Sequence, residues 1–286
     1  MTAQVTVGVD GSAESLAAAR WAAREAVVRE VPLRLVCVEE WPGTPEMPLP
    51  YARTVAERTD VLLRDEAARA RRRHPGLEVF TEQARGRAAE ELRAAADEAD
   101  LMVLGSRGLG SVSGFVIGSV SLAVAGTARR PVVLVRADGD ASAAPSGRIV
   151  VGLDMYDPCE DLLAFSFAEA ARRKSSLGFL HSWTLPAYYG AGAVLDPRIA
   201  AEVKVDLEGR LDELLAPWRE RFPDVKATAV AVEGPVADQL IDASRDAELV
   251  IVGRRSRKLP VGPRLGHVAH ALIHHSPVPV AVVPFE

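Results

Sequence analysis

Short runs of branched apolar residues alternate along this chain with longer segments in which apolar residues recur every three to four positions. The short runs are typical of buried β-strands, and the longer segments have the period of amphipathic helices. In the first half we predict strands at 4–9, 33–38, 77–83, 101–104 and 132–135, and helices at 12–29, 54–73, 88–98 and 119–128. Strands that alternate with helices indicate an α/β fold on a parallel sheet, and nearly continuous apolar strands indicate a sheet covered on both faces.

The second half of the chain repeats this order. We predict strands at 149–153, 177–180, 226–232, 249–252 and 280–283, and helices at 162–173, 200–221, 236–243 and 267–274. Val7–Asp10 returns as Val151–Asp154, 144 positions later (151 − 7), and Asp100–Gly105 returns as Glu248–Gly253, 148 positions later (253 − 105). A repeat this long is a whole domain. We therefore predict domain 1 at residues 1–136 and domain 2 at 148–286, joined by a small, polar linker at 137–147.

The composition narrows the class of protein. A chain of 286 residues that is 48% hydrophobic and 26% charged can bury two separate cores. The net charge of −5 shows no basic footprint, so we expect no nucleic-acid partner. No apolar stretch reaches the roughly 18 residues of a membrane helix, and no signal peptide is recognisable, which favours a cytoplasmic protein without a membrane partner. Cys37 and Cys159 show no disulfide framework, and Cys37 has the surroundings of a small buried hydrophobe.

A glycine-rich segment follows the fourth predicted strand and leads into a helix. Its glycines are Gly105, Gly108, Gly110, Gly114 and Gly118. Backbone N–H groups in such a segment can form an anion-binding nest, and the helix that begins near Gly118 adds the positive end of its dipole. Ser119 and Ser121 can cap this helix or donate to phosphate oxygens, and Arg107 places a cation inside the segment. A tight connection without a ligand is the alternative interpretation.

Motifs of several other nucleotide-binding and catalytic classes are missing. The sequence contains no GxxxxGK[ST] loop, no GxGxxG after the first strand, no HExxH, no paired CxxC and no GxSxG. No combination of general base, nucleophile and metal ligands is recognisable, so we predict no catalytic residues. The basic stretch Arg69–His74 is typical of a solvated helix end, where positive charge suits the dipole.

The glycine-rich segment and the repeat together resemble the universal stress protein family in its tandem, two-domain form. The family motif Gly-x2-Gly-x9-Gly-Ser/Thr is matched by Gly105, Gly108, Gly118 and Ser119, and Val7–Ser12 is similar to the family's first strand. The resemblance covers both halves of the chain. It implies two tandem Rossmann-like domains of the adenine nucleotide alpha hydrolase-like type, each a five-stranded parallel sheet with helices on both faces.

The resemblance also implies a ligand: ATP or a related adenine nucleotide, with Mg²⁺ as the ion that accompanies it. The nucleotide would lie across the carboxyl ends of strands one and four of domain 1. The implied contacts are Asp10, Gly11, Val38, Gly105, Arg107, Gly108, Gly118, Ser119, Val120 and Ser121. For Asp10, an N-cap of the following helix is an equally good and compatible interpretation. For Val38, a plain core position is the stronger one.

Domain 2 departs from the motif. Gly253 is kept, but Ser256 stands at the second glycine and His267 follows Gly266 where the motif has serine or threonine. Pro260 and Pro263 remove backbone donors from the segment. We therefore expect domain 1 to be the better nucleotide site. The weaker candidates in domain 2 are Asp154, Gly253, Arg255, Ser256, Gly266 and His267, with the basic run 254–258 as a second route to an anion.

Other features leave two interpretations each. Residues 42–50 and 186–197 follow the second strand of each half and are either lids over a ligand crevice or longer crossovers. Trp41 and Trp183 share that position and suggest a repeated packing role. His267, His270 and His274 lie on one face of a predicted helix at a spacing that suits a metal, but their apolar neighbours predict packing, so we expect no metal site.

The sequence thus predicts a regulatory, stress-response protein that binds an adenine nucleotide mainly in domain 1 and is not a fast enzyme. The resemblance also implies that the fifth strands pair the two domains as an intramolecular pseudo-dimer, and homodimerisation stays open. Two alternatives remain: a nucleotide-free scaffold that acts through protein partners, and a slow ATPase or adenylyl-transferring enzyme of the same fold.

Overall fold

The computed structural model describes residues 3–40, 49–106, 118–137, 147–184, 197–256 and 265–286. In domain 1 the elements are β1 (Val5–Gly8), α1 (Ala13–Arg29), β2 (Leu33–Glu39), α2 (Leu49–Arg73), β3 (Val79–Arg85), α3 (Ala88–Asp97), β4 (Leu101–Gly105), α4 (Ser119–Thr127) and β5 (Val132–Val135). In domain 2 they are β6 (Arg148–Gly152), α5 (Glu160–Arg173), β7 (Ser176–Trp183), α6 (Pro197–Arg221), β8 (Ala227–Glu233), α7 (Val236–Ser244), β9 (Leu249–Arg255), α8 (His267–His275) and β10 (Val280–Phe285). Among the described residues, no helix is both long and apolar enough to cross a membrane.

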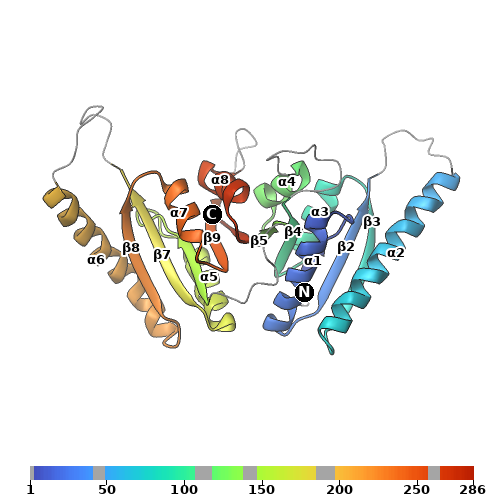
Figure 1. The fold of residues 1–286 in the computed structure, drawn as a ribbon, viewed down its shortest axis with the longest axis horizontal. Helices are drawn as coiled ribbons and strands as arrows, with labels where there is room; N and C mark the ends of the chain where they lie inside the picture. Colours follow the sequence, from blue (N-terminus) through green and yellow to red (C-terminus); the bar gives the residue numbers. More distant parts are fainter. Residues whose placement is uncertain (1–2, 41–48, 107–117, 138–146, 185–196, 257–264) are drawn as a thin grey trace.

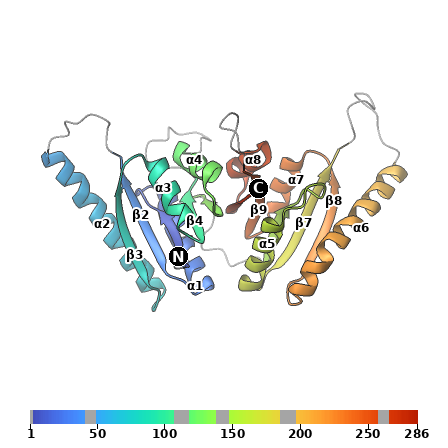
Figure 2. The same ribbon diagram turned by 180° about the vertical axis from the view of Figure 1, so that it is seen from behind.

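One continuous sheet runs through both domains. Its strand order is β3-β2-β1-β4-β5-β10-β9-β6-β7-β8, and the five strands of each domain are parallel to one another. At the centre β5 and β10 are antiparallel, with Val280 opposite Leu134 and Val282 opposite Val132. The expected pairing through the fifth strands is therefore confirmed, and the two domains lie side by side with α2 and α6 at the outer ends (Figures 1 and 2).

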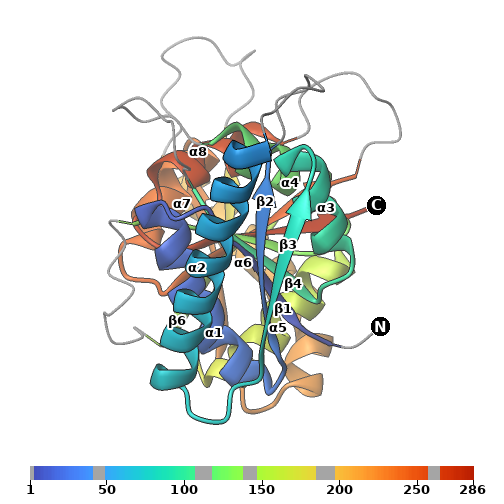
Figure 3. The same cartoon turned by 90° about the vertical axis from the view of Figure 1, so that its right-hand side faces the viewer.

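Helices cover both faces of this sheet, as predicted. Alternate residues of a strand face opposite sides, so in β4 Leu101 and Val103 pack on one face and Met102 and Leu104 on the other. The first face is covered by α1, α2, α5 and α6, and the second by α3, α4, α7 and α8. Figure 3 shows α2 and α3 on opposite sides of the outer strands of domain 1.

Several element boundaries lie one to five residues away from the predicted ones. α2 begins at Leu49, five residues before the predicted start at 54, because the apolar pattern is weak in its first turns. β9 continues to Arg255 instead of ending at 252, because β10 extends to Phe285 and pairs with it residue by residue as far as Phe285 opposite Arg255. Arg254 and Arg255 therefore lie in a strand, beyond its predicted end at 252.

A buried cluster of four charged side chains joins the domains between α1 and α5. Glu25 and Arg29 occupy the same positions in α1 as Glu169 and Arg173 in α5, 144 residues apart. Each arginine pairs with the glutamate of its own helix and with that of the other helix, and both glutamates are 1% exposed. Arg173 also lies over the ring of Trp21 and Arg29 over that of Phe165. The interface therefore repeats the internal symmetry of the chain.

The two glutamates of this cluster, which hydrogen-bond to each other, titrate differently. Burial, followed by the charge of Glu25, raises the pKa of Glu169 to about 7. Burial alone would raise the pKa of Glu25 as well, but the charges of Arg173 and Arg29 outweigh it and lower that pKa. The pair therefore holds one proton well above the pH at which a solvated carboxyl loses it.

Candidate nucleotide-binding site

The crevice of domain 1 lies where the strand order changes direction. From β1 the chain moves outward to β2 and β3, and it then returns to place β4 on the other side of β1. Ligands of open α/β sheets bind at such a point, beyond the carboxyl ends of the strands. The residues that follow β1 and β4, beginning with Val9 and Ser106, are therefore the ones that a ligand would meet.

Gly105 ends β4 against the first turn of α1. A Cβ atom at this position would lie 2.8 Å from the backbone carbon of Glu14 and from the backbone nitrogen of Ser15. No side chain fits there without moving the backbone, so this glycine is required by close packing. The next residue, Ser106, is buried, and its backbone nitrogen donates to the carbonyl of Val135 at 2.8 Å.

The two ends of the glycine-rich segment lie next to each other. The backbone nitrogen of Gly118 donates to the carbonyl of Ser106 at 3.0 Å, which brings the start of α4 next to the end of β4. Arg107 and Gly108 fall between these two residues and lie outside the described part of the chain. The structure therefore fixes the two ends of the predicted phosphate-binding segment at the crevice.

The helix that starts here, α4, has a glycine N-cap. Gly118 makes no side-chain cap hydrogen bond, Ser119 is exposed and Val120 is half-buried. A helix start without a side-chain cap leaves backbone N–H groups for another acceptor, and the helix dipole favours an anion there. The predicted role of Ser119 or Ser121 as the cap is wrong, because Gly118 holds that position.

Ser121 has a structural partner. It is buried, and its Oγ donates to the carbonyl of Gly105 at 2.6 Å. Its hydroxyl hydrogen therefore ties α4 to β4 in this structure instead of pointing at a phosphate oxygen. The sequence could not separate these two uses of the same hydroxyl.

Asp10 organises the turn after β1. One carboxylate oxygen, Oδ1, accepts from the backbone nitrogen of Ser12 at 2.9 Å and from Ser12 Oγ at 2.6 Å. Ser12 is the N-cap of α1, and its Oγ accepts from the backbone nitrogen of Ser15. The predicted N-cap role of Asp10 is therefore wrong, because Ser12 holds that position and Asp10 supports it. Gly11 between them has φ +85°, a conformation that favours glycine.

Val38 and Cys37 point to opposite faces near the end of β2. Val38 is half-buried and packs at the edge of the core under α3 and α4, a place that suits both core packing and an exposed apolar slot. Cys37 is buried on the other face, and burial raises its pKa to about 11. The thiol therefore stays protonated, as expected for a small buried hydrophobe. Neither Cys37 nor Cys159 forms a disulfide.

The matching crevice of domain 2 is built differently at β9. Arg255 forms an ion pair with Asp157 and lies 5.8 Å from the centre of the Phe285 ring. The backbone nitrogen of Ser256 donates to the carbonyl of Phe285 at 2.6 Å. Two of the weaker candidates are thus held by β10 and by the loop after β6, while residues 257 and 258 lie outside the described part.

Arg254 faces the domain interface instead of a ligand. It is buried, its Nη2 donates to the carbonyl of Ala128 in domain 1, and burial lowers its pKa. From domain 1, Arg136 Nη1 donates across the same interface to the carbonyl of His274 in domain 2, at 2.6 Å. The expectation that Arg254 contributes to an anion site is therefore wrong.

The remaining candidates of domain 2 have these places. Asp154 is exposed and accepts from the backbone nitrogen of Tyr156 at 3.0 Å, and Gly253 packs where a Cβ would meet the Phe285 ring at 2.7 Å. Gly266 is the N-cap of α8, with no side-chain cap hydrogen bond, and His267 is exposed in its first turn. The rings of His270 and His274 are tilted against each other, with centres 4.5 Å apart. Among the described residues, no group of three or more histidine, cysteine or acidic side chains is arranged to hold a metal.

Polar residues stand at the positions of Val38 and Cys37 in domain 2. Ser182 takes the position of Val38, and its Oγ donates to the carbonyl of Gly234. His181 takes the position of Cys37, with Nδ1 3.1 Å from the carbonyl of Leu153. Neither residue stands in a recognisable motif, although the offset of 144 between the repeats relates them to Val38 and Cys37.

Comparison with known proteins gives one consistent result. The Universal stress protein family matches residues 1–136 and again 145–284. Universal stress protein Mb2028c of Mycobacterium bovis is 34% identical over 97% of this chain and 96% of its own length. Universal stress protein Rv2623 of Mycobacterium tuberculosis is 32% identical over 97% of this chain and 95% of its own length.

A solved structure shares the complete two-domain fold. The crystal structure of a universal stress protein from Archaeoglobus fulgidus matches 98% of this chain and 98% of its own, with a TM-score of 0.71 and 16% identity. With the double match of the family and the length of the relatives, this agrees with the tandem α/β architecture described above. The chain belongs to the universal stress protein family, with two copies of the family's domain in tandem.

Proposed function

We propose that this protein binds ATP or a related adenine nucleotide in the crevice between β1 and β4 of domain 1, and that binding serves regulation in a stress response. The observation that carries the proposal is the junction of β4 and α4. Gly105 lies against the backbone of α1, Ser106 and Gly118 join the ends of the glycine-rich segment, and α4 starts without a side-chain cap. Backbone N–H groups at such a start suit phosphate oxygens.

The other contacts of the proposed site fit the parts of a nucleotide. Val38 offers a half-buried apolar surface that suits a base, and Asp10 lies exposed after β1, where it can accept from a ribose hydroxyl. Mg²⁺ would accompany the phosphates. These groups bind and orient a ligand, which supports regulation through binding rather than rapid turnover.

Domain 2 is the weaker site in this proposal. Ser182 replaces the apolar Val38, and Arg255 and Ser256 are engaged by Asp157 and Phe285. The uncapped start of α8 at Gly266 is the feature that domain 2 keeps. A single strong site per chain follows from this difference.

The test is calorimetric titration of ATP into nucleotide-free protein, with and without Mg²⁺. We expect close to one equivalent to bind. In a Gly118→Asp variant binding is lost, because the new carboxylate repels phosphate at the helix start. Aspartate is also a good N-cap, and the φ of −59° and ψ of 130° at this position suit it, so the helix itself is kept.

Gly266→Asp is the matched control in domain 2. Its backbone has nearly the same conformation, and a Cβ there meets nothing within 4 Å. We expect this variant to bind ATP as the unchanged protein does. Loss of binding in Gly266→Asp with binding kept in Gly118→Asp would reverse the assignment of domains. No binding by a folded, unchanged protein would reject the proposal and favour a scaffold.

A further inference from the structure

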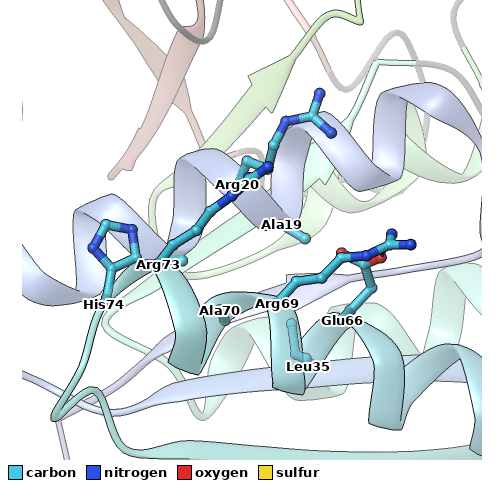
Figure 4. A pocket seen from close by; sticks show the side chains of 9 residues that line it. Ala19, Arg20, Leu35, Glu66, Arg69, Ala70, Arg73 and His74 are labelled. Atoms are coloured by element: carbon cyan, nitrogen blue, oxygen red, sulfur yellow. Dashed lines mark hydrogen bonds and ion pairs between the residues drawn. The ribbon is translucent and has the colours of Figure 1, made fainter.

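A cleft between α1 and α2 of domain 1 lies apart from the nucleotide crevice. Its base is formed by the buried residues Ala19, Ala23, Leu35 and Ala70. Around this base stand Arg20 from α1, Glu66, Arg69 and Arg73 from α2, and His74 directly after α2 (Figure 4). We call this the α1–α2 cleft. Because α2 ends there and leads into the start of β3, its basic end lies at the amino ends of the strands, opposite the junction of β4 and α4.

Small residues at its base keep the α1–α2 cleft open, because the equivalent positions of domain 2 carry large aromatic residues that fill the space. Positions in α1 and β2 recur 144 residues later, and the 25-residue helices α2 and α6 start 148 residues apart (197 − 49). The equivalents of Ala23, Leu35, Ala70 and His74 are Phe167, Phe179, Trp218 and Phe222. These four rings stack on one another, with centres 5.5 to 6.5 Å apart.

Domain 1 thus has an opening where domain 2 has a filled aromatic core. The charges at the rim differ in the same way. Arg20 and Arg69 correspond to Ala164 and Pro217, and Arg221, the equivalent of Arg73, lies over the rings of Trp218 and Phe222. The basic rim therefore belongs to domain 1.

The rim carries an excess of positive charge in a chain whose net charge is −5. Glu66 is buried and pairs with Arg69, which neutralises that arginine. Arg20 and Arg73 are exposed, and the described part of the chain shows no ion pair for either. The helix dipole accounts for basic residues at the end of α2 but not for Arg20 and Arg24, which come from α1.

Neighbouring ionisable groups respond to this excess. Burial and the charges of Arg173, Arg20 and Arg73 lower the pKa of Arg24. Burial and the charges of Arg24 and Arg73 lower the pKa of His74. A bound anion would reverse the electrostatic part of both shifts.

We propose that the α1–α2 cleft binds a small oxyanion of the phosphate class. Guanidinium groups present parallel N–H donors that match the oxygens of phosphate, and exposed arginine side chains can turn toward a ligand between them. Arg20 and Arg73 hold the anion at the mouth of the cleft, and His74 adds a donor. This site is separate from the proposed nucleotide site, and it gives domain 1 a second ligand at the other end of its sheet.

The test is thermal unfolding of the full chain in millimolar inorganic phosphate, compared with chloride at the same ionic strength. We expect a saturable rise in Tm in the unchanged protein. In an Arg20→Gln/Arg73→Gln variant the apparent affinity falls at least roughly tenfold, the effect of removing one charge-assisted contact. The NMR titration of His74 provides a local readout, and phosphate should raise its pKa.

Two matched variants separate this site from others. Arg72→Gln removes a neighbouring exposed charge that does not line the cleft, and it should keep the response to phosphate. Gly118→Asp adds a negative charge at the start of α4, in the proposed nucleotide site, and should also keep the response of the α1–α2 cleft to phosphate. Equal loss in Arg72→Gln would reduce the effect to general electrostatics, and loss in Gly118→Asp alone would assign the phosphate to the nucleotide site. Either result, or a His74 pKa unchanged by phosphate, overturns the proposal.

Discussion

Domains 1 and 2 share a framework but differ at two places. Both have the same strand order, the same central glutamate and arginine in α1 and α5, and glycine at the equivalent of Gly105. They differ at the junction of the fourth strand with the last helix, and at the packing of the first two helices. In domain 1 the first place is a glycine-rich helix start and the second is an open basic cleft.

In domain 2 the corresponding places are taken by protein atoms. Arg255 and Ser256 bind Asp157 and Phe285, and four aromatic rings fill the space of the α1–α2 cleft. Repeated features are those that both halves need in order to fold and pair. Features confined to domain 1 are the candidates for function. A duplicated chain thus allows framework and site to be separated within one molecule.

The largest expected effect tests the shared framework. In a Glu25→Gln/Glu169→Gln variant, Arg29 and Arg173 stay buried without a carboxylate, and the free energy of unfolding should fall by about 3–5 kcal/mol. Chemical denaturation followed by circular dichroism at pH 6 measures this. Glu169→Gln alone should change it by less than about 1 kcal/mol, since that carboxyl is already protonated at pH 6. A single variant as unstable as the double one would contradict the shared proton.

Alanine substitutions at the equivalent glycines Gly105 and Gly253 should differ in their cost to stability. Gly105→Ala places its Cβ against the backbone of Glu14 and Ser15, which cannot move without shifting α1, so we expect a loss of about 3 kcal/mol. In Gly253→Ala the atoms nearest to the new Cβ belong to the side chains of Phe285 and Leu162 and not to the backbone, so we expect a loss of about 1 kcal/mol. Urea midpoints of the two variants give the comparison. Equal losses would mean that the two junctions are equally rigid.

The pH dependence of stability tests the inequality of the two glutamates. The folded-state pKa of Glu169 is raised from 4.5 to about 7, so the folded protein keeps a proton that the unfolded chain has lost. The free energy of unfolding should therefore fall as pH rises from about 4.5 to about 7, by on the order of 1–3 kcal/mol. Denaturation across this range should show the slope in the unchanged protein. Glu169→Gln, which cannot titrate, should lose this part of the slope, and a slope kept in that variant would assign it to other groups.

The smallest effect concerns the hydroxyl that joins α4 to β4. Ser121→Ala removes the hydrogen bond to the carbonyl of Gly105 and should cost about 1 kcal/mol. Domain 2 already has alanine, Ala269, at the equivalent position. Thermal unfolding of Ser121→Ala and of the reverse change Ala269→Ser gives the comparison, and we expect the second to be close to neutral. If Ser121→Ala lowered ATP affinity without changing stability, the hydroxyl would belong to the ligand site.

Much of this architecture follows from local pattern. The periods of apolar residues identify every strand and helix of the described chain, because buried strands and amphipathic helices need those periods to cover a sheet on both faces. The repeat identifies two domains, and the family resemblance supplied the pairing of fifth strands that the structure confirms. The site candidates Gly105 and Gly118 were recognisable because tight backbone packing and helix starts have their own residue preferences.

Contacts between distant residues were beyond that pattern. From the sequence, Asp10 was a candidate N-cap of α1, whereas in the structure Ser12 is the N-cap. Arg254 was a candidate for binding an anion, whereas in the structure it donates to the carbonyl of Ala128 across the domain interface. In the same way the α1–α2 cleft depends on alanines that are ordinary in each helix and leave a space only when α1 packs against α2. The sequence by itself determined the elements, the duplication and the glycine-rich junction, because these depend on residues close along the chain. The partners of buried charges and the shape of clefts were decided by the tertiary structure, because packing brings together side chains that are far apart in sequence.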